Sequence, residues 1–188
     1  HGAGREDTDV RMLGRGRPFV VEVKKPKKRF INLRGLTERI NEVARGKVRV
    51  SGLRLADKDT VRLLKKPEAA QKLYRAMVEF DKPISDEQLS ILANAFTNVV
   101  VRQQTPRRVL HRRADLIREK HIYEAKVKRL KSNRVELRIR CQGGLYIKEL
   151  ITGDEGRTNP NVAEILKVRA VPLELDVLGV FVEEETKS

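Results

Sequence analysis

One segment alternates apolar and charged side chains without a break, and this pattern restricts the fold more than any other feature of the chain. Within residues 134–141, apolar side chains occupy every second position, and arginine or glutamate fills the positions between. A period of two residues is typical of a strand that buries one face. Residues 121–130 precede this segment across a short polar turn at 131–133, so the two segments are predicted to pair as a β-hairpin.

Other stretches have the pattern of further strands and of helices. Strands are expected at 19–23, 47–56, 72–80, 98–103 and 168–183. Helices are expected at 35–45 with Gly46 as its end, after Ser85 in a capping box with Gln88, at 145–151, and at 159–167 with Pro160 in its first turn. The basic stretch 104–113 has no amphipathic period and is expected to be an exposed loop. This order predicts an α+β fold, a mostly antiparallel or mixed sheet with helices packed on one side.

The net charge indicates what kind of partner the chain binds. It contains 41 Lys and Arg against 26 Asp and Glu, a formal charge of +15. So many positive charges repel one another in the folded protein, and binding to a polyanion reduces this repulsion. Nucleic acid is therefore the first candidate partner. The alternative is a thermophile surface with networks of ion pairs, but those networks need nearly balanced charge.

Several classes of site are excluded or made unexpected by composition. A single cysteine rules out an internal disulfide and a cysteine-rich zinc cluster, and the three histidines lack metal-ligand spacing, so no metal is expected. No apolar run is long enough to span a bilayer and no signal peptide is visible, so we expect a soluble, cytoplasmic protein with no membrane partner. Because the sequence starts at His1 inside a motif-like loop, we expect a piece of a longer polypeptide with partner domains upstream.

Three short stretches have residues that could carry chemistry, and each also has a plain structural interpretation. The opening loop places Glu6, Asp7 and Asp9 among arginines, which favour an ionised carboxylate, although a solvated turn would have the same composition. Tyr74, near the start of a predicted strand, could equally be a core tyrosine. The glycine pair before Lys148 could equally be a helix start with one exposed lysine.

Taken together, GREDTDVRMLGRGRPF, KLYRAMV and GLYIKEL resemble the three motifs of pseudouridine synthases, in the same order. The whole chain is similar to the archaeal and eukaryotic family that forms pseudouridine-54/55 in tRNA, and the stretches QTPRRVLHRR and GDEGRTNPNV share this similarity. The resemblance implies that Asp7 is the catalytic aspartate, that Tyr74 stacks on the target base, and that Lys148 pairs with the carboxylate. Lysine replaces the arginine more usual in the wider superfamily, which removes a bidentate contact to carboxylate.

The implied reaction needs no cofactor, because uridine becomes pseudouridine without redox change. The bond from ribose C1′ to N1 breaks, and the uracil rotates and rejoins through C5. Asp7 would be the nucleophile, at the sugar or at the base ring, with Lys148 keeping it ionised. Tyr74 would stack, relay the final proton, or both, and the sequence does not decide whether Tyr74 or a water removes the C5 proton.

The target base must flip out of its stack, and Arg5 is expected to fill the vacancy. Extruding the base costs free energy, and contacts to phosphates are expected to offset this cost. These contacts are expected from the basic run 24–29 and from other basic loops. The expected RNA-binding residues are Arg5, Arg11, Arg15, Arg17, Arg107, Arg108, His111, Arg112 and Arg113. The partner implied by the resemblance is the TΨC arm of tRNA, with residues 1–188 as one catalytic domain and an RNA-binding domain upstream in the same polypeptide.

A different class of function fits the same composition. A non-catalytic basic RNA-binding module would also bind RNA in a salt-dependent way. A DNA-binding domain is disfavoured because neither a helix-turn-helix pattern nor a basic recognition helix is found.

Overall fold

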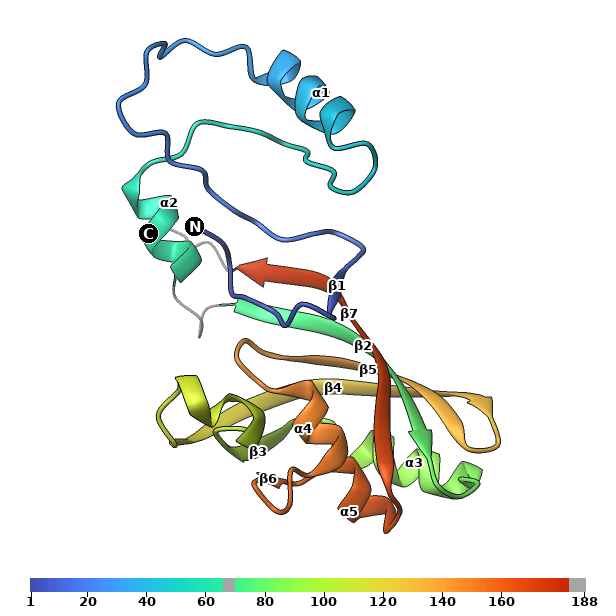
Figure 1. The fold of residues 1–188 in the computed structure, drawn as a ribbon. Helices are drawn as coiled ribbons and strands as arrows, with labels where there is room; N and C mark the ends of the chain where they lie inside the picture. Colours follow the sequence, from blue (N-terminus) through green and yellow to red (C-terminus); the bar gives the residue numbers. More distant parts are fainter. Residues whose placement is uncertain (66–69, 183–188) are drawn as a thin grey trace.

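A single mixed sheet is the framework of the computed structural model, which describes residues 1–65 and 70–182 (Figure 1). Within these residues seven strands are joined in the order β1-β7-β2-β5-β4-β3-β6. The strands are β1 (Arg11–Met12), β2 (Ala70–Phe80), β3 (Val99–Gln104), β4 (Ile117–Lys131), β5 (Arg134–Gln142), β6 (Thr158–Asn159) and β7 (Ala170–Val182). The helices are α1 (Leu33–Val43), α2 (Lys58–Lys65), α3 (Asp86–Ala95), α4 (Ile147–Thr152) and α5 (Val162–Leu166), with a 3-10 helix, η2 (Arg107–Arg112).

The predicted hairpin forms the middle of the sheet. β4 and β5 pair in antiparallel register, with Val127 opposite Leu137, and β5 pairs in turn with β2. β2 also pairs antiparallel with β7, so both of its edges are hydrogen bonded. Only β1 and β7 run parallel among the described pairs. The prediction of a mostly antiparallel, mixed sheet is therefore confirmed.

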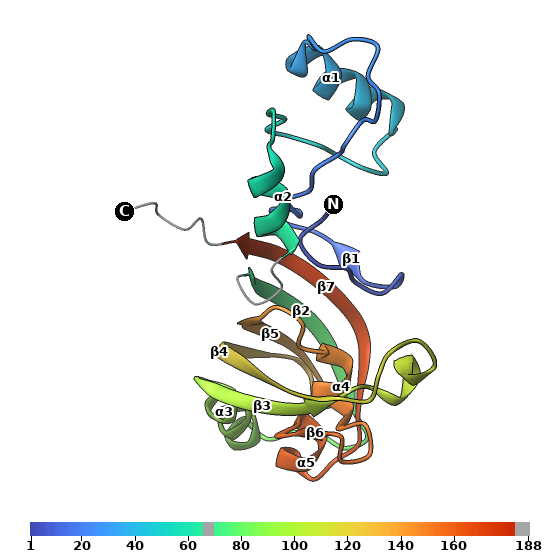
Figure 2. The ribbon, with the colours of Figure 1, turned by 90° about the vertical axis from the view of Figure 1, so that its left-hand side faces the viewer.

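One face of the sheet carries the core and the helical layer. Every second residue of β2, from Ala70 to Phe80, is buried, as its alternation predicted, and Cys141 on β5 is fully buried on the same side. α3, α4 and α5 lie together against this face (Figure 2). α3 begins with the predicted capping box, in which the Ser85 hydroxyl accepts from the Gln88 N–H and the Gln88 side chain accepts from the Ser85 N–H.

Residues 20–56, here called the arm, extend from the β1 and β7 edge of the sheet and contain α1 (Figure 1). The predictions of strands at 19–23 and 47–56 are wrong. Phe19 makes one isolated bridge to Gly2, and no ladder follows it. At Val50, the side chain of Asn41 donates to the backbone carbonyl at 2.9 Å and accepts from the N–H at 2.7 Å. A side chain thus satisfies the backbone that a partner strand would have paired.

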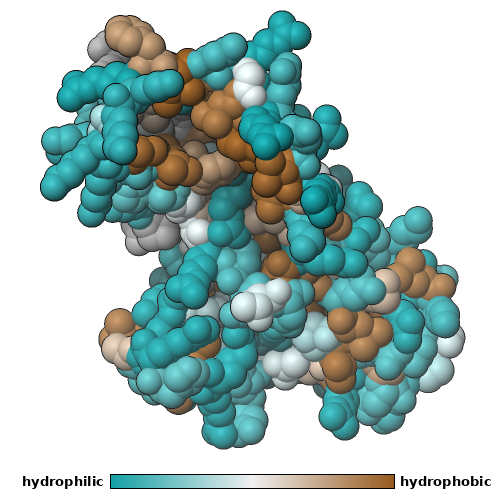
Figure 3. Space-filling model, turned by 45° about the horizontal axis from the view of Figure 1, so that its top comes forward, coloured by the Kyte–Doolittle hydropathy of each residue, from teal (hydrophilic) through white to brown (hydrophobic). Residues whose placement is uncertain are grey.

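The arm carries exposed apolar side chains. Figure 3 shows apolar residues gathered over it. Its most exposed apolar side chains are Val21, Val23, Phe30, Val43 and Leu55. Alternating valines therefore did not mark a strand here, and the backbone of Val50 is paired by the side chain of Asn41.

Other boundaries differ locally from expectation. α1 starts two residues earlier than predicted and its last turn leads to Gly46, which has a left-handed φ of 77°. α2 and β1 were not predicted. The stretch 104–113 is not wholly a loop, because η2 forms within it and buries Val109. Pro160 precedes the N-cap Asn161 instead of occupying the first turn of α5, and residue 183, the predicted end of the last strand, lies outside the described residues.

The loop after β1 lies directly on β7. The N–H groups of Leu13 and Arg15 donate to the carbonyls of Val177 and Leu178 at 2.8 and 3.1 Å. Gly14 between them has a φ of 66°, and a Cβ there would lie 2.3 Å from the Leu178 carbonyl oxygen. Glycine is needed at this contact, which anchors the opening segment to the sheet.

In the part of the chain that the structure describes, no helix is both long enough and apolar enough to cross a bilayer. The same residues contain no group of three or more His, Cys, Asp or Glu placed to hold a metal ion.

Candidate active site

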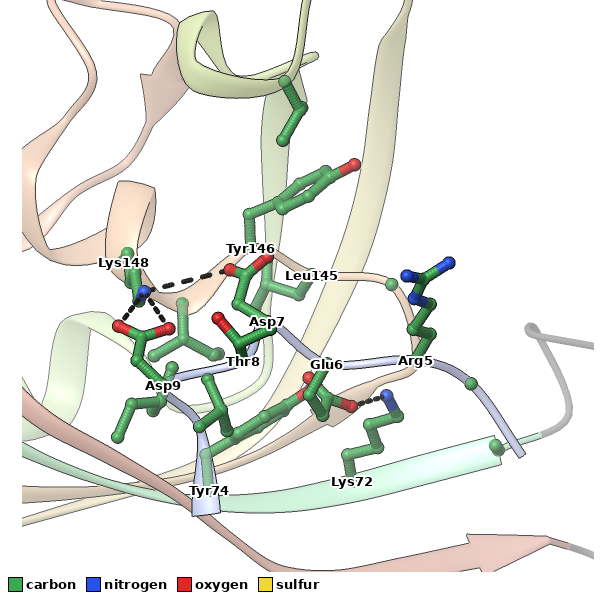
Figure 4. Close-up of a pocket in the computed structure, with 18 of the residues that line it drawn as sticks. Arg5, Glu6, Asp7, Thr8, Asp9, Lys72, Tyr74, Leu145, Tyr146 and Lys148 are labelled. Carbon is green, nitrogen blue, oxygen red and sulfur yellow. Dashed lines mark hydrogen bonds and ion pairs between the residues drawn. The ribbon is translucent and has the colours of Figure 1, made fainter. Parts of the chain in front are cut away.

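A cleft of about 720 Å³ opens where the first loop crosses the start of β2 and faces α4. This volume is in the usual range for a small-molecule site. Asp7, Tyr74 and Lys148 all line the cleft, although 67 and 74 residues of sequence separate them (Figure 4). The structure therefore brings together the three residues that the resemblance named.

Asp7 lies among cations from two other segments. The Arg108 Nη1 atom is 2.8 Å from Asp7 Oδ2, whereas the Lys148 Nζ atom is 3.9 Å from the same oxygen. Arg112 approaches the other oxygen at 3.8 Å. The direct ion-pair partner of Asp7 is thus Arg108, a residue predicted from sequence only as an RNA contact.

Arg108 bridges two carboxylates. Its Nε atom donates to Glu149 Oε1 at 2.6 Å, while its Nη1 atom faces Asp7. Burial opposes the charge on Arg108, but its hydrogen bonds to Glu149 and Asp7 outweigh burial and raise its pKa. Because Glu149 is only 5% exposed, Arg108 is held firmly on the α4 side of the cleft.

Lys148 is chiefly paired with Asp9. Its ammonium donates to both oxygens of Asp9, at 2.8 and 2.6 Å (Figure 4). The hydrogen bond from Lys148 lowers the pKa of Asp9 below its ordinary value, and the charge of Lys148 adds to this effect. Asp9 therefore keeps its negative charge and holds the lysine near Asp7.

Glu6 lies on the floor of the cleft beside Tyr74. It forms an ion pair with the buried Lys72 and another with Arg17, whose Nη2 atom is 3.4 Å away. The Tyr74 hydroxyl donates to Glu6 Oε2 at 3.4 Å. Burial raises the pKa of Tyr74 well above its ordinary value, and the negative charge of Glu6 raises it further, so the phenol keeps its proton near neutral pH.

The local sequence explains how these side chains meet. The period of two in β2 places Lys72 and Tyr74 on the same face. Gly4 has a φ of 83°, and a Cβ there would lie 2.8 Å from the Lys72 Nζ atom, so glycine lets the loop close over this lysine. Before α4, the Tyr146 N–H donates to Gln103 Oε1 at 2.8 Å, which fixes the start of the helix that presents Lys148.

Comparison with known proteins decides the family. The profile of the family described as Pus10, C-terminal, matches residues 1–181. The chain belongs to this family. Curated relatives named tRNA pseudouridine synthase Pus10 include those of Thermofilum pendens, 47% identical over 187 residues, and Methanocaldococcus jannaschii, 50% identical over 181 residues. These matches cover 99% and 96% of the chain but only 41% and 39% of the relatives.

The fold is also found in a more distant protein. A chain in the crystal structure of a Cbf5-Nop10-Gar1 complex superposes with a TM-score of 0.51 and 21% identity. The superposition covers 70% of this Pus10 family chain and 37% of the other. This similarity shows that the two proteins share a fold.

The predicted RNA-binding residues are not all at the cleft of this Pus10 family member. Four of them line it, namely Arg5, Arg108, Arg112 and Arg113. Arg5 is exposed on its rim and makes no hydrogen bond or ion pair with the described residues, and in Figure 4 its guanidinium points away from the loop. Arg113 donates to the Tyr146 hydroxyl at 3.1 Å.

The other five predicted contacts lie outside the cleft lining. Arg11 pairs with Glu174 and Asp176, each at 2.6 Å, and Arg107 pairs with Glu155 at 2.6 Å. Arg17 lies partly inside the opening loop, where it donates to the Gly4 carbonyl at 2.7 Å. The remaining two, Arg15 and His111, are exposed.

Sequence reasoning missed the roles of Lys72 and Glu149 as partners in the cleft. A signal for Lys72 was available, because it is two residues from Tyr74 on a strand and must share its face. Glu149 follows Lys148 directly, yet nothing in the sequence indicates that it meets Arg108, 41 residues away.

Proposed function

We propose that this chain is the catalytic domain of a tRNA pseudouridine synthase, which isomerises uridine in the TΨC arm, at position 54, 55 or both. The proposal is supported by the names of its curated relatives and by the charged cleft that contains Asp7. Because the chain matches only about two fifths of those relatives, the activity is proposed for the whole polypeptide, with an upstream RNA-binding domain completing the grip on tRNA.

Asp7 is the proposed nucleophile. Its side chain is partly exposed at the cleft, where it can reach an extruded nucleotide. The carboxylate attacks the ribose C1′ or the uracil ring, the C1′–N1 bond breaks, and the freed uracil rotates within the cleft. C5 then bonds to C1′, the bond to Asp7 breaks and releases the carboxylate, the proton on C5 leaves, and N1 takes up a proton. No electrons are gained or lost, so the chemistry requires no cofactor.

Arg108 and Lys148 supply positive charge around this carboxylate. Arg108 is in direct contact with Asp7, and Lys148 lies 3.9 Å away while paired with Asp9. Opposite charges at these distances attract the carboxylate and hold it in place at the cleft. They also stabilise the uracil as it departs with the electrons of the broken bond.

Arg5 is proposed to support base flipping. It is exposed at the cleft rim and has no hydrogen bond or ion pair with residues 1–65 and 70–182, so its planar head is available to stack where the base was. Arg112 and Arg113 also line the cleft and are proposed to contact phosphates next to the flipped nucleotide.

The position of Asp7 in the cleft is the observation on which the proposal depends, and Asp7→Asn is its test. The full-length variant should bind a tRNA transcript as wild type does but form no pseudouridine, because an amide is not a nucleophile here. The alternative, a non-catalytic RNA-binding module, predicts tight binding and no product from the wild-type protein. Product formation by Asp7→Asn at the wild-type rate would refute the role of Asp7.

A further inference from the structure

The pairing of Tyr74 with Glu6 has no part in the reaction as described so far. Glu6 is adjacent to the proposed nucleophile, yet its side chain is only 15% exposed and turns toward the floor of the cleft (Figure 4). Its two oxygens have different partners. Lys72 and Arg17 both contact Oε1, whereas the Tyr74 hydroxyl donates to Oε2.

The last step of the isomerisation needs an acceptor for the C5 proton. Tyr74 lies against the space where the uracil would stack, but it is almost completely buried and its pKa is raised by that burial. A neutral phenol can accept a proton only if it gives up its own at the same time. The Tyr74 hydroxyl already donates to Glu6 Oε2, whereas the ion pairs with Lys72 and Arg17 are to Oε1.

We infer that Glu6 is the final proton acceptor of the reaction, through the hydroxyl of Tyr74. The C5–H bond breaks, its electron pair restores the C5–C6 double bond of the uracil, and the electron pair displaced onto N1 takes up a proton from water. The proton passes to the Tyr74 oxygen while the phenolic proton passes to Glu6 Oε2, so the carboxylate becomes a carboxylic acid and Tyr74 is unchanged. The inference rests on the proposed function, because it concerns the same cleft and the same product.

The surroundings of Glu6 fit this role. Lys72 is 5% exposed and fixes Oε1, so the carboxylate cannot rotate away from the tyrosine. Arg17 also holds the loop in place, because it donates to the Gly4 carbonyl and forms an ion pair with Glu6. Glu6 acts through Tyr74 and not on the nucleotide, so it is a positioning and proton-accepting residue, distinct from the nucleophile.

Glu6→Gln tests the inference, because glutamine preserves the shape and the contact to Lys72 but is not a base. With full-length protein and tRNA carrying deuterium at C5 of the target uridine, we expect pseudouridine formation to slow roughly 10²-fold. The deuterium isotope effect should exceed that of wild type. Tyr74→Phe should behave alike, and the double variant should be no slower than the slower single variant.

A 5-fluorouridine substrate separates proton removal from positioning. Fluorine at C5 is not lost as a proton, so attack and glycosidic cleavage proceed without the final step. Glu6→Gln should therefore consume 5-fluorouridine in tRNA at the wild-type rate, whereas Asp7→Asn should consume none. Glu38→Gln, on the exposed arm helix, is the matched control and should leave both reactions unchanged.

Three results would overturn the inference. Equal slowing of the uridine and 5-fluorouridine reactions by Glu6→Gln would show that Glu6 only holds the loop. An unchanged rate and isotope effect would show that Glu6 has no role. Absence of product from wild type would instead refute the proposed function, and this inference with it.

Discussion

Lys148 donates to both carboxylate oxygens of Asp9, at 2.8 and 2.6 Å, and lies 3.9 Å from the nearer oxygen of Asp7. The Lys148 ammonium therefore forms ion pairs with two acids of the same loop. A lysine suits this arrangement because its three donors rotate about a compact ammonium and can face both acids. The direct contact to Asp7 is made by Arg108 instead.

This arrangement predicts different consequences for the two partners of the ion pair. Lys148→Met should slow pseudouridine formation roughly 10²-fold, because it removes a positive charge beside Asp7. Asp9→Asn should slow it less than about tenfold, since Asp9 is largely exposed and such pairs contribute little. Lys148→Arg, which keeps the charge, is the control. Single-turnover assays of the full-length protein measure all three, and a greater loss in Asp9→Asn than in Lys148→Met would contradict this assignment.

The contact between Arg108 and Glu149 predicts a separation of stability from activity. Arg108→Ala leaves a buried carboxylate without its charged donor and should lower the free energy of unfolding by about 1–3 kcal/mol. Adding Glu149→Gln removes that carboxylate charge and should restore most of the stability. It should not restore pseudouridine formation, because Asp7 still lacks Arg108. Urea denaturation and a product assay test the pair, and recovered activity in the double variant would show that Arg108 is structural only.

The sheet could be predicted because the alternation of apolar and polar residues that defines its strands is visible within each short segment. β2 and β5 alternate strictly, since one face of each packs in the core and the other is more exposed. The arm could not be predicted in this way. Val48 and Val50 alternate with basic residues as well, but a strand also needs a partner strand, and here the side chain of Asn41 pairs the backbone of Val50 instead.

The residues of the cleft were found through resemblance of motifs, but their pairings were not. Tyr74 and Lys148 were expected near Asp7, and the structure places all three at one cleft. That Arg108 contacts Asp7 depends on the path of η2, 101 residues further along the chain. No short-range pattern encodes such a contact, because it is determined by how separate loops cross the ends of the strands.

Asp176 predicts a pH dependence of stability. This buried carboxylate accepts from Arg11 and Arg75 across the β1, β7 and β2 strands. Burial opposes its charge, but the two arginines outweigh burial and lower the pKa of Asp176. The pKa of Asp176 is thus lower in the folded protein than in the unfolded chain, where it is about 3.9. The charged carboxylate therefore contributes its full stabilisation above this unfolded pKa. The contribution is lost as the pH falls through the folded pKa.

Asp176→Asn should therefore be less stable than wild type by about 1–3 kcal/mol at neutral pH. The difference should stay constant down to about pH 5 and shrink below about pH 4, as wild type loses the charge of the carboxylate. Thermal or urea unfolding of both proteins from pH 7 to pH 3 tests this. A difference that grows as the pH falls would contradict the lowered pKa.

Arg113 and Lys126 give a test of where tRNA binds. Arg113 lines the cleft, whereas Lys126 lies on β4 outside the lining and pairs with Glu124 at 2.8 Å. If Arg113 contacts a phosphate, Arg113→Ala should weaken tRNA binding without changing the product. It should also reduce the steepness of the salt dependence by roughly one unit in a plot of log affinity against log salt concentration. Lys126→Ala should leave both quantities unchanged, because its charge is already paired away from the cleft. Filter binding or fluorescence anisotropy between about 50 and 200 mM salt covers the range in which the slope is measurable. If the two variants weaken tRNA binding equally, tRNA contacts the basic surface broadly and does not bind preferentially at the cleft beside η2.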